Sequence, residues 1–294
     1  MNKLSKCAYP IIWKCNLSCH GCSNYSNHRI MANESLPDWK NELQLFAKHF
    51  TVEKFYILGG EPLLNPYAED IIYESFKFSD KVQLITNGIS LKSNLWLQKL
   101  VLENNNFEIY ISYHQSKELI GKTKYDEIFI SNISELLNIS ESAIIKKIQA
   151  FKDVSLPKGI SLIPNVYLGL TYQDWRFPKL DNNDIPLPYN SNYVNAKMNA
   201  CHCPVPHLYK NKIYKCHVTA LLPDLLEKHG KYDDNWHALK DYEPVSLKME
   251  NIIEYKNLYT PEPVCSICPE SIDEFEKGNK RDKYNKIINL VLDN

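Results

Sequence analysis

Residues 8–22 read "AYPIIWKCNLSCHGC" and hold three cysteines in their last eight positions. Cys15, Cys19 and Cys22 have the spacing C-x3-C-x2-C and directly follow an apolar run at 8–13 that predicts a short β-strand. An iron–sulfur cluster or a structural zinc ion takes four ligands, so three thiols leave one position open. Spacing alone leaves three interpretations: an iron–sulfur cluster, a zinc site with a distant fourth ligand such as His20 or His28, or free buried thiols.

The composition is that of a globular chain large enough to bury a sizeable core. It has 294 residues, of which 44% are hydrophobic and 23% charged, with a formal net charge of -1. We expect a cytoplasmic protein without a nucleic-acid or membrane partner, because the charge is balanced, no apolar run approaches a membrane span and the first residues make a poor signal peptide. Nine cysteines in a reducing compartment indicate metal binding more than disulfides.

Strand-like and helix-like stretches alternate up to about residue 170. Strands are predicted at 53–60, 81–88, 107–114 and 161–172, and helices at 35–50 (with Ser35 as N-cap), 67–78, 93–105 and, in more than one piece, 125–151. This alternation predicts an α/β fold with a parallel sheet, whose carboxyl ends carry the chemistry. We expect one unit at 1–172 and a second, Cys-rich unit at 173–294 that ends in a polar helix.

Two further motifs follow the cysteines in order: "LGGEPLLNP" (58–66) after the second strand and "TNG" (86–88) after the third. The ordered set resembles the radical S-adenosylmethionine (SAM) superfamily over residues 8 to about 170. The resemblance implies a partial (β/α)6 TIM-like barrel in which Cys15, Cys19 and Cys22 hold a [4Fe-4S] cluster. SAM would bind its open iron, and one electron from a flavodoxin or ferredoxin would cleave SAM to a hydrogen-abstracting 5′-deoxyadenosyl radical.

The resemblance also implies a set of residues that contact SAM. The GGEP turn would receive the methionine ammonium group, while later strand ends would touch its carboxylate or the ribose; the set is Gly59, Gly60, Glu61, Pro62, Thr86, Asn87 and Ser112. An ordinary tight turn and ordinary strand-end caps are the alternatives. The chain departs from the family at Gly21, where an aromatic residue often packs on adenine; His20 or Tyr25 could replace it.

A second group of cysteines lies in the C-terminal part: Cys201, Cys203, Cys216, Cys265 and Cys268. Four thiols complete a closed site, which by itself could bind zinc. The pattern resembles the twitch extension, a shortened SPASM domain, and so implies one auxiliary iron–sulfur cluster, with [4Fe-4S] as the expected type. Asn211 occupies the usual glycine position of its hairpin and tolerates the same positive φ. Spacing favours Cys201 as the first ligand, with Cys203 as a rival, and the spare thiol and Cys7 are expected in the core.

The substrate is the least determined feature. We expect a small polar metabolite, such as a sugar or nucleotide sugar, that is oxidised, epimerised or modified at a C–H bond. A peptide or protein side chain is the alternative substrate, and a non-catalytic zinc-binding interaction protein is the alternative of another class. Tyr113, His114 and Arg176 are candidate substrate contacts, since an arginine suits a phosphate or carboxylate, although structural or surface roles are common for these residue types.

Overall fold

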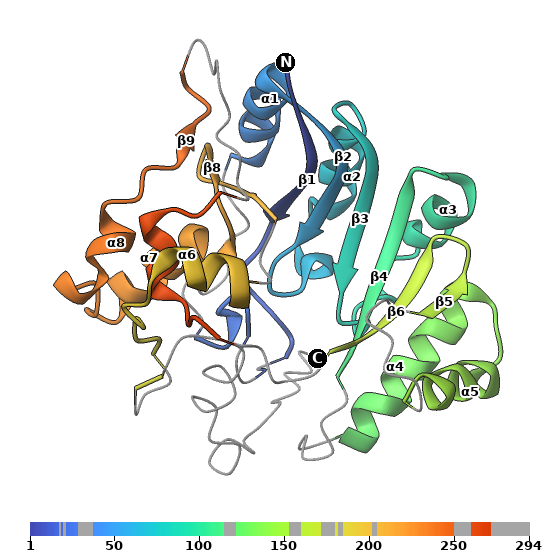
Figure 1. Cartoon of the computed structure of the whole chain (residues 1–294). Helices are drawn as coiled ribbons and strands as arrows, with labels where there is room; N and C mark the ends of the chain where they lie inside the picture. The colour runs from blue at the N-terminus through green and yellow to red at the C-terminus, as the bar shows by residue number, and fades with distance from the viewer. Residues whose placement is uncertain are drawn as a thin grey trace.

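The computed structural model describes residues 1–17, 19, 22–28, 38–114, 122–152, 160–171, 180–181, 185–201, 205–249 and 260–271. Within these residues the chain forms an α/β fold around one mixed nine-stranded sheet, in the order β5-β6-β4-β3-β2-β1-β7-β8-β9 (Figure 1). The strands β1, β2, β3, β4 and β6 run parallel to one another, and β7 continues the sheet from the other side of β1 through the pair Ala8 and His207. The hairpin of the C-terminal part therefore joins the sheet of the N-terminal part.

The strands lie at β1 (Asn2–Pro10), β2 (Phe50–Leu58), β3 (Ser79–Thr86), β4 (Phe107–His114), β5 (Ile160–Ile163), β6 (Val166–Thr171), β7 (His207–Tyr209), β8 (Lys212–Tyr214) and β9 (Val245–Ser246). The α-helices are α1 (Trp39–His49), α2 (Ala68–Ser75), α3 (Trp96–Glu103), α4 (Lys122–Leu137), α5 (Glu141–Lys152), α6 (Tyr193–Asn195), α7 (His217–Lys228) and α8 (His237–Lys240). Short 3-10 turns are η1 (Ser26–His28), η2 (Pro62–Leu64), η4 (Asp234–Trp236) and η5 (Pro263–Ile267), and η3 (Ala196–Ala200) is a π-helical turn.

Two expectations about the strands are wrong in detail. The first strand begins at Asn2 and not at residue 8, because its polar first half pairs with β2 along its length. The single strand expected at 161–172 is the antiparallel hairpin β5–β6, since Pro164 has no N–H to continue a ladder and Asn165 turns the chain with φ 66°. The break in the 125–151 helical stretch is confirmed, at Asn138 with φ 52°. Ser35 and the expected helix beyond residue 271 lie outside the described residues.

The helices α1, α2 and α3 cover one face of the sheet (Figure 1). Phe46 of α1 is fully buried there, and its ring centroid lies 5.2 Å from that of Phe50, 5.1 Å from Phe78 and 5.9 Å from Phe55. This aromatic cluster anchors α1 to β2, and α1 in turn connects the first cysteine loop to the next strand. No single described helix is long and apolar enough to cross a membrane, although α4 and α5, bent by 117°, pass that length and composition test as a pair.

We expect Phe46→Ala to lower the free energy of unfolding by about 3–5 kcal/mol, because it empties a fully buried aromatic site. Urea denaturation measures this loss. The control is Leu102→Ala in α3, whose side chain is 63% exposed and whose loss should cost no more than about 0.5 kcal/mol. Equal costs for both variants would show that the Phe46 cluster does not hold the α1 layer in place.

Candidate active site

Three sequence motifs meet at the carboxyl-terminal ends of neighbouring strands of the sheet. The cysteine loop follows β1, the GGEP turn follows β2 and the TNG segment follows β3, and these three strands are parallel neighbours. Their carboxyl ends therefore face the same side, as expected for an α/β sheet with its chemistry at that edge.

The two glycines bring the GGEP turn into contact with the backbone of the cysteine loop. The N–H of Gly60 donates to the carbonyl of Ile12 (2.7 Å), and that of Glu61 donates to the carbonyl of Lys14 (2.8 Å). A Cβ on Gly60 would lie 2.2 Å from the Lys14 oxygen, and one on Gly59 would lie 2.4 Å from the Ile12 oxygen. Only glycine allows this close approach, so the pair shapes the cysteine loop.

Glu61 is fully buried, and three hydrogen-bond donors of the same chain bind its carboxylate. Its carboxylate accepts hydrogen bonds from the Leu63 N–H (3.1 Å), the Thr86 hydroxyl (2.7 Å) and the Asn87 N–H (2.8 Å). Burial raises the pKa of Glu61 from 4.5 to about 7, although these donors favour the charged form. The carboxylate thus ties the end of β2 to the end of β3, and its expected contact with the SAM ammonium group stays a prediction.

Asn87 extends this connection to the first cysteine. Its side-chain amide donates to Asn16 Oδ1 (2.7 Å) and lies 3.7 Å from Cys15 Sγ, while Asn16 donates to the Ser90 hydroxyl (3.1 Å). The N–H of Leu17 also donates to Cys15 Sγ (3.4 Å). Sequence analysis singled out Asn87 but missed Asn16 and Ser90, whose only signal was their position beside the motifs.

Two more asparagines, also missed, pin the loop to the strand ends. Asn24 donates to the Gly59 carbonyl (2.7 Å), and Asn65 donates to the Ile11 carbonyl (2.7 Å). Each connects the cysteine loop or the end of β1 with the segment after β2. The loop is therefore fixed by side-chain hydrogen bonds from both directions.

The three thiols of the loop lie near one another. Burial raises the pKa of Cys15 and of Cys19, and the neighbouring thiols raise both further. Glu61 also raises the pKa of Cys15. Cys15 and Cys19 thus remain protonated until a cation stabilises the thiolate. Three cysteines on one short loop are chemically suited to an iron–sulfur cluster.

The other predicted residues take several positions. Pro62 begins η2, Thr86 is engaged with Glu61, and Ser112 pairs with Gly169. Tyr113 does not face the site: its ring packs against Tyr125 and Phe129 of α4, and its hydroxyl donates to Asp126 (2.9 Å). This corrects the expectation for Tyr113, because a strand places successive side chains on opposite faces.

Four of the residues named from the sequence cannot be placed in full. The side chain of His114, together with His20, Gly21 and Arg176, lies outside the described residues, while Tyr25 is buried. The expected roles of His114 and Arg176 stay predictions.

The structure gathers four of the five C-terminal cysteines. Burial raises the pKa of Cys216, Cys265 and Cys268, and charge repulsion with Cys201 raises all three further. Cys265 lies within η5, Cys268 directly follows it, and Cys216 immediately precedes α7. Cys203 lies outside the described residues, and Cys7 is a buried core thiol, as expected.

Two lysines accompany these thiols. Lys197 Nζ lies 3.7 Å from Cys201 Sγ. Lys215 is buried and donates to the Thr260 carbonyl (2.5 Å) and to Glu262 (2.8 Å). Both ammonium groups lower the pKa of Cys265 against the larger effect of burial. Asn211 has φ 58°, which confirms that it adopts the glycine-like conformation in the β7–β8 turn.

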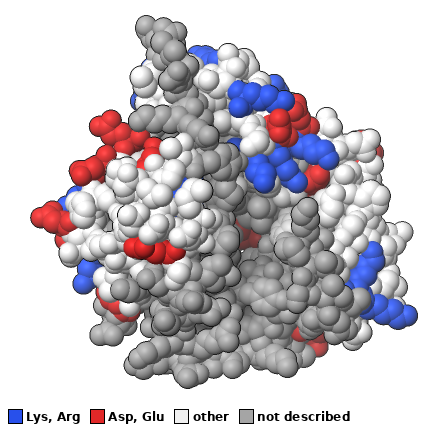
Figure 2. Space-filling model, viewed as in Figure 1, with Lys and Arg blue, Asp and Glu red and all other residues white. Residues whose placement is uncertain are grey.

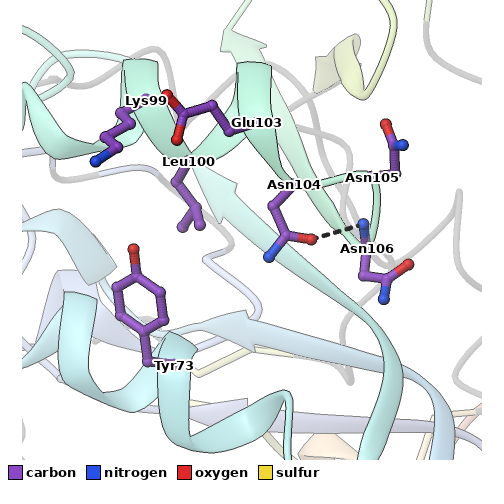
Figure 3. A pocket seen from close by; sticks show the side chains of 7 residues that line it. All are labelled: Tyr73, Lys99, Leu100, Glu103, Asn104, Asn105 and Asn106. Atoms are coloured by element: carbon purple, nitrogen blue, oxygen red, sulfur yellow. Dashed lines mark hydrogen bonds between the residues drawn. The ribbon is translucent and has the colours of Figure 1, made fainter.

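Among the described residues, no group of three or more His, Cys, Asp or Glu side chains is arranged to ligate a single metal ion. A surface cavity of about 320 Å³ lies away from both thiol groups, beside the loop that precedes β4 (Figure 3). It is lined by Tyr73, Lys99, Leu100, Glu103, Asn104, Asn105 and Asn106. Its position at the amino end of β4 separates it from the carboxyl edge that carries the motifs.

The chain belongs to the radical SAM superfamily, whose family model matches residues 9–177. It is therefore an enzyme, and membership implies a [4Fe-4S] cluster and SAM. The thiol set at 15–22 fits this cluster, as its chemistry indicates above.

Two curated relatives are similar over part of their length. A GTP 3′,8-cyclase of Aquifex aeolicus (strain VF5) is 27% identical over 205 residues, which cover 58% of this chain and 59% of that protein. An S-adenosylmethionine-dependent nucleotide dehydratase of Thermoplasmatales archaeon (strain ISO4-H5) is 31% identical over 90 residues, which cover 31% of each. The chain thus spans about three fifths of the first relative and about a third of the second.

We expect Glu61→Gln to make the stability of the iron-free protein less dependent on pH. A carboxyl group whose pKa is raised on folding binds its proton more tightly in the folded state, so the wild type loses stability as pH rises from 4.5 to about 7. That loss is roughly 3 kcal/mol at 1.36 kcal/mol per pH unit. The stability of the variant relative to wild type should therefore rise between about pH 5 and pH 8 in urea denaturation.

The matched control is Glu103→Gln, which removes an exposed carboxylate of α3 and should follow the wild-type profile. Parallel profiles for Glu61→Gln and wild type would contradict the prediction.

We expect Asn87→Ala to lower the midpoint potential of the N-terminal cluster in the reconstituted enzyme. A donor near a cluster thiolate favours the reduced, more negative state, so its removal makes reduction harder. One hydrogen bond of about 0.5–1.5 kcal/mol corresponds to roughly 20–60 mV for one electron. Redox titration followed by electron paramagnetic resonance measures the shift, and Asn104→Ala in the loop before β4 is the control. An unchanged potential with full iron content would show that the amide does not act on the cluster.

Proposed function

We propose that this chain cleaves SAM reductively at its N-terminal cluster and abstracts hydrogen from a nucleotide or a related small polar molecule. The observation that carries the proposal is the convergence of the cysteine loop, Glu61 and Asn87 at one edge of the sheet. When bound, the cluster and SAM supply the one-electron chemistry that forms the 5′-deoxyadenosyl radical.

The residues of the chain bind and orient in this proposal. Cys15, Cys19 and Cys22 hold the cluster. Gly59 and Gly60 shape the turn beside the cysteine loop. The buried carboxylate of Glu61 fixes the ends of β2 and β3. Side chains at the ends of β3 and β4 would then contact SAM from the same edge. The surrounding strands would form the partial (β/α)6 barrel, with a core unit at 1–172.

Nucleotides are the favoured substrate class. Both curated relatives are named for reactions on nucleotides, which favours a small-molecule substrate over a peptide. An oxidation, an epimerisation or another C–H modification of that substrate would follow hydrogen abstraction. A flavodoxin or ferredoxin would supply the electron.

We also propose that the unit at 173–294 is a twitch-like extension with an auxiliary [4Fe-4S] cluster. Cys201, Cys216, Cys265 and Cys268 would be its ligands, which is supported by the electrostatic coupling among these four thiols. Thiolate ligands and four positions suit this cluster as a closed site. Lys197 and Lys215 would offset part of its negative charge.

The test is anaerobic reconstitution with iron and sulfide, followed by an iron count and an assay for 5′-deoxyadenosine from SAM and dithionite. Wild type should hold about eight irons, as expected for two cubane clusters. Replacing Cys15, Cys19 and Cys22 by Ala should leave about four irons and no 5′-deoxyadenosine. Replacing Cys265 and Cys268 by Ala should also remove about four irons but should leave a SAM-cleaving cluster.

Cys7→Ala is the matched control, because it removes a buried thiol outside both groups and should leave the iron content unchanged. If the wild type holds about four irons and all of them depend on the N-terminal cysteines, the auxiliary cluster is excluded but the SAM-cleaving function is not. Zinc without 5′-deoxyadenosine would overturn the proposed function.

A further inference from the structure

A row of three lysines crosses the sheet at one level. Lys6 of β1 is the register partner of Lys54 of β2, and Lys54 is the register partner of Lys81 of β3. Partners on parallel strands project from the same face of a sheet, so the three side chains stand side by side. We call Lys6, Lys54 and Lys81 the lysine row.

The lysine row lies on the face opposite the helices. The next residue on β2 is Phe55, which is fully buried against Phe46 of α1, and the next on β3 is Val82, which is also fully buried. Because side chains alternate along a strand, Lys54 and Lys81 point away from α1 and α2. Figure 2 looks at this face and shows lysine side chains, with acidic side chains among them, over the amino-terminal halves of β1–β3.

One carboxylate organises part of the row. Glu108 of β4 is buried and accepts hydrogen bonds from Lys54 (2.6 Å), Lys81 (3.0 Å) and the amide of Gln83 (2.9 Å). Burial opposes its charge, yet the two ammonium groups hold the pKa of Glu108 below its ordinary value. Three ammonium groups and one carboxylate leave two positive charges, which an anionic ligand can compensate.

Aromatic rings continue the same face toward the carboxyl ends. Tyr56 follows Lys54 by two residues, with Lys54 Nζ 5.7 Å from its ring centroid. Tyr110 follows Glu108 by two residues and is in register with Tyr167 of β6. Gly169 leaves room for the Tyr110 ring, because a Cβ there would lie 1.7 Å from the Tyr110 hydroxyl oxygen. The face therefore changes from cationic to aromatic along the strands.

We propose that the lysine row binds the phosphate groups of a nucleotide substrate, whose nucleoside part extends along this face toward the cysteine loop. This inference rests on the proposed function and names a binding site for its substrate class. Gly60 lies six positions after Lys54, just beyond the end of β2, or about 20 Å away at 3.3 Å per residue, which suits a nucleoside carrying a polyphosphate chain. Ammonium groups bind phosphate by charge-assisted hydrogen bonds.

The experiment measures binding of inorganic tripolyphosphate, GTP and guanosine to the reconstituted enzyme by calorimetry at low ionic strength. Lys6→Gln and Lys81→Gln should each weaken tripolyphosphate and GTP binding about tenfold or more, and should leave guanosine binding unchanged. Lys81→Arg should retain tripolyphosphate binding, because it keeps the charge. Added salt should weaken the wild type more than either Gln variant.

Lys48→Gln is the matched control, since it removes an exposed lysine of α1 on the opposite face. Tripolyphosphate affinity that is equal in all variants, or no affinity in the wild type, would overturn the inference. The same preparations are assayed for 5′-deoxyadenosine from SAM and dithionite. If 5′-deoxyadenosine forms normally but phosphate binding does not depend on the lysines, only this binding site is rejected. If neither 5′-deoxyadenosine nor bound iron is found, the proposed function is rejected as well.

Discussion

The buried carboxylate of Glu61 is the interaction on which the site depends. A carboxylate without solvent is costly unless several donors compensate it, and here the donors come from its own turn and from the end of β3. The Asn87 N–H that satisfies Glu61 also fixes where the Asn87 side chain points, which is toward Cys15 and Asn16. One charge thus sets the distance between two strand ends and the position of the first thiol.

The N-terminal and C-terminal sets of cysteines are connected by packing between their segments rather than by a linker. The β7–β8 hairpin docks on β1, and its tip is held by a hydrogen bond from the Asn211 N–H to the buried carboxylate of Glu42, which also accepts from Tyr9. Trp13 packs edge-on against Tyr209, with ring centroids 5.9 Å apart. The segment that leads into Cys15 therefore contacts the hairpin that leads into Cys216.

The face of the sheet opposite the helices carries an unusual number of polar and charged residues. A filled barrel interior is dominated by branched apolar residues, whereas this face carries the lysine row, Glu108 and Gln83. The ion pairs among them satisfy the buried carboxylate but leave excess positive charge. A polar face beside a carboxyl edge with thiols and glycines suits the handling of a polar, anionic substrate.

The sequence by itself determined the order of motifs, the strand ends that carry them, the α/β class and the glycine-like turn at Asn211, because each depends on local pattern or on conformational preference. It missed the β5–β6 hairpin, the early start of β1 and the orientation of Tyr113 toward α4. Strand bounds and faces depend on which neighbour pairs with the strand. Only the tertiary structure decided that Asn16 meets Asn87 and that Lys6, Lys54 and Lys81 share one register. These contacts join residues far apart in the chain, and no local spacing encodes them.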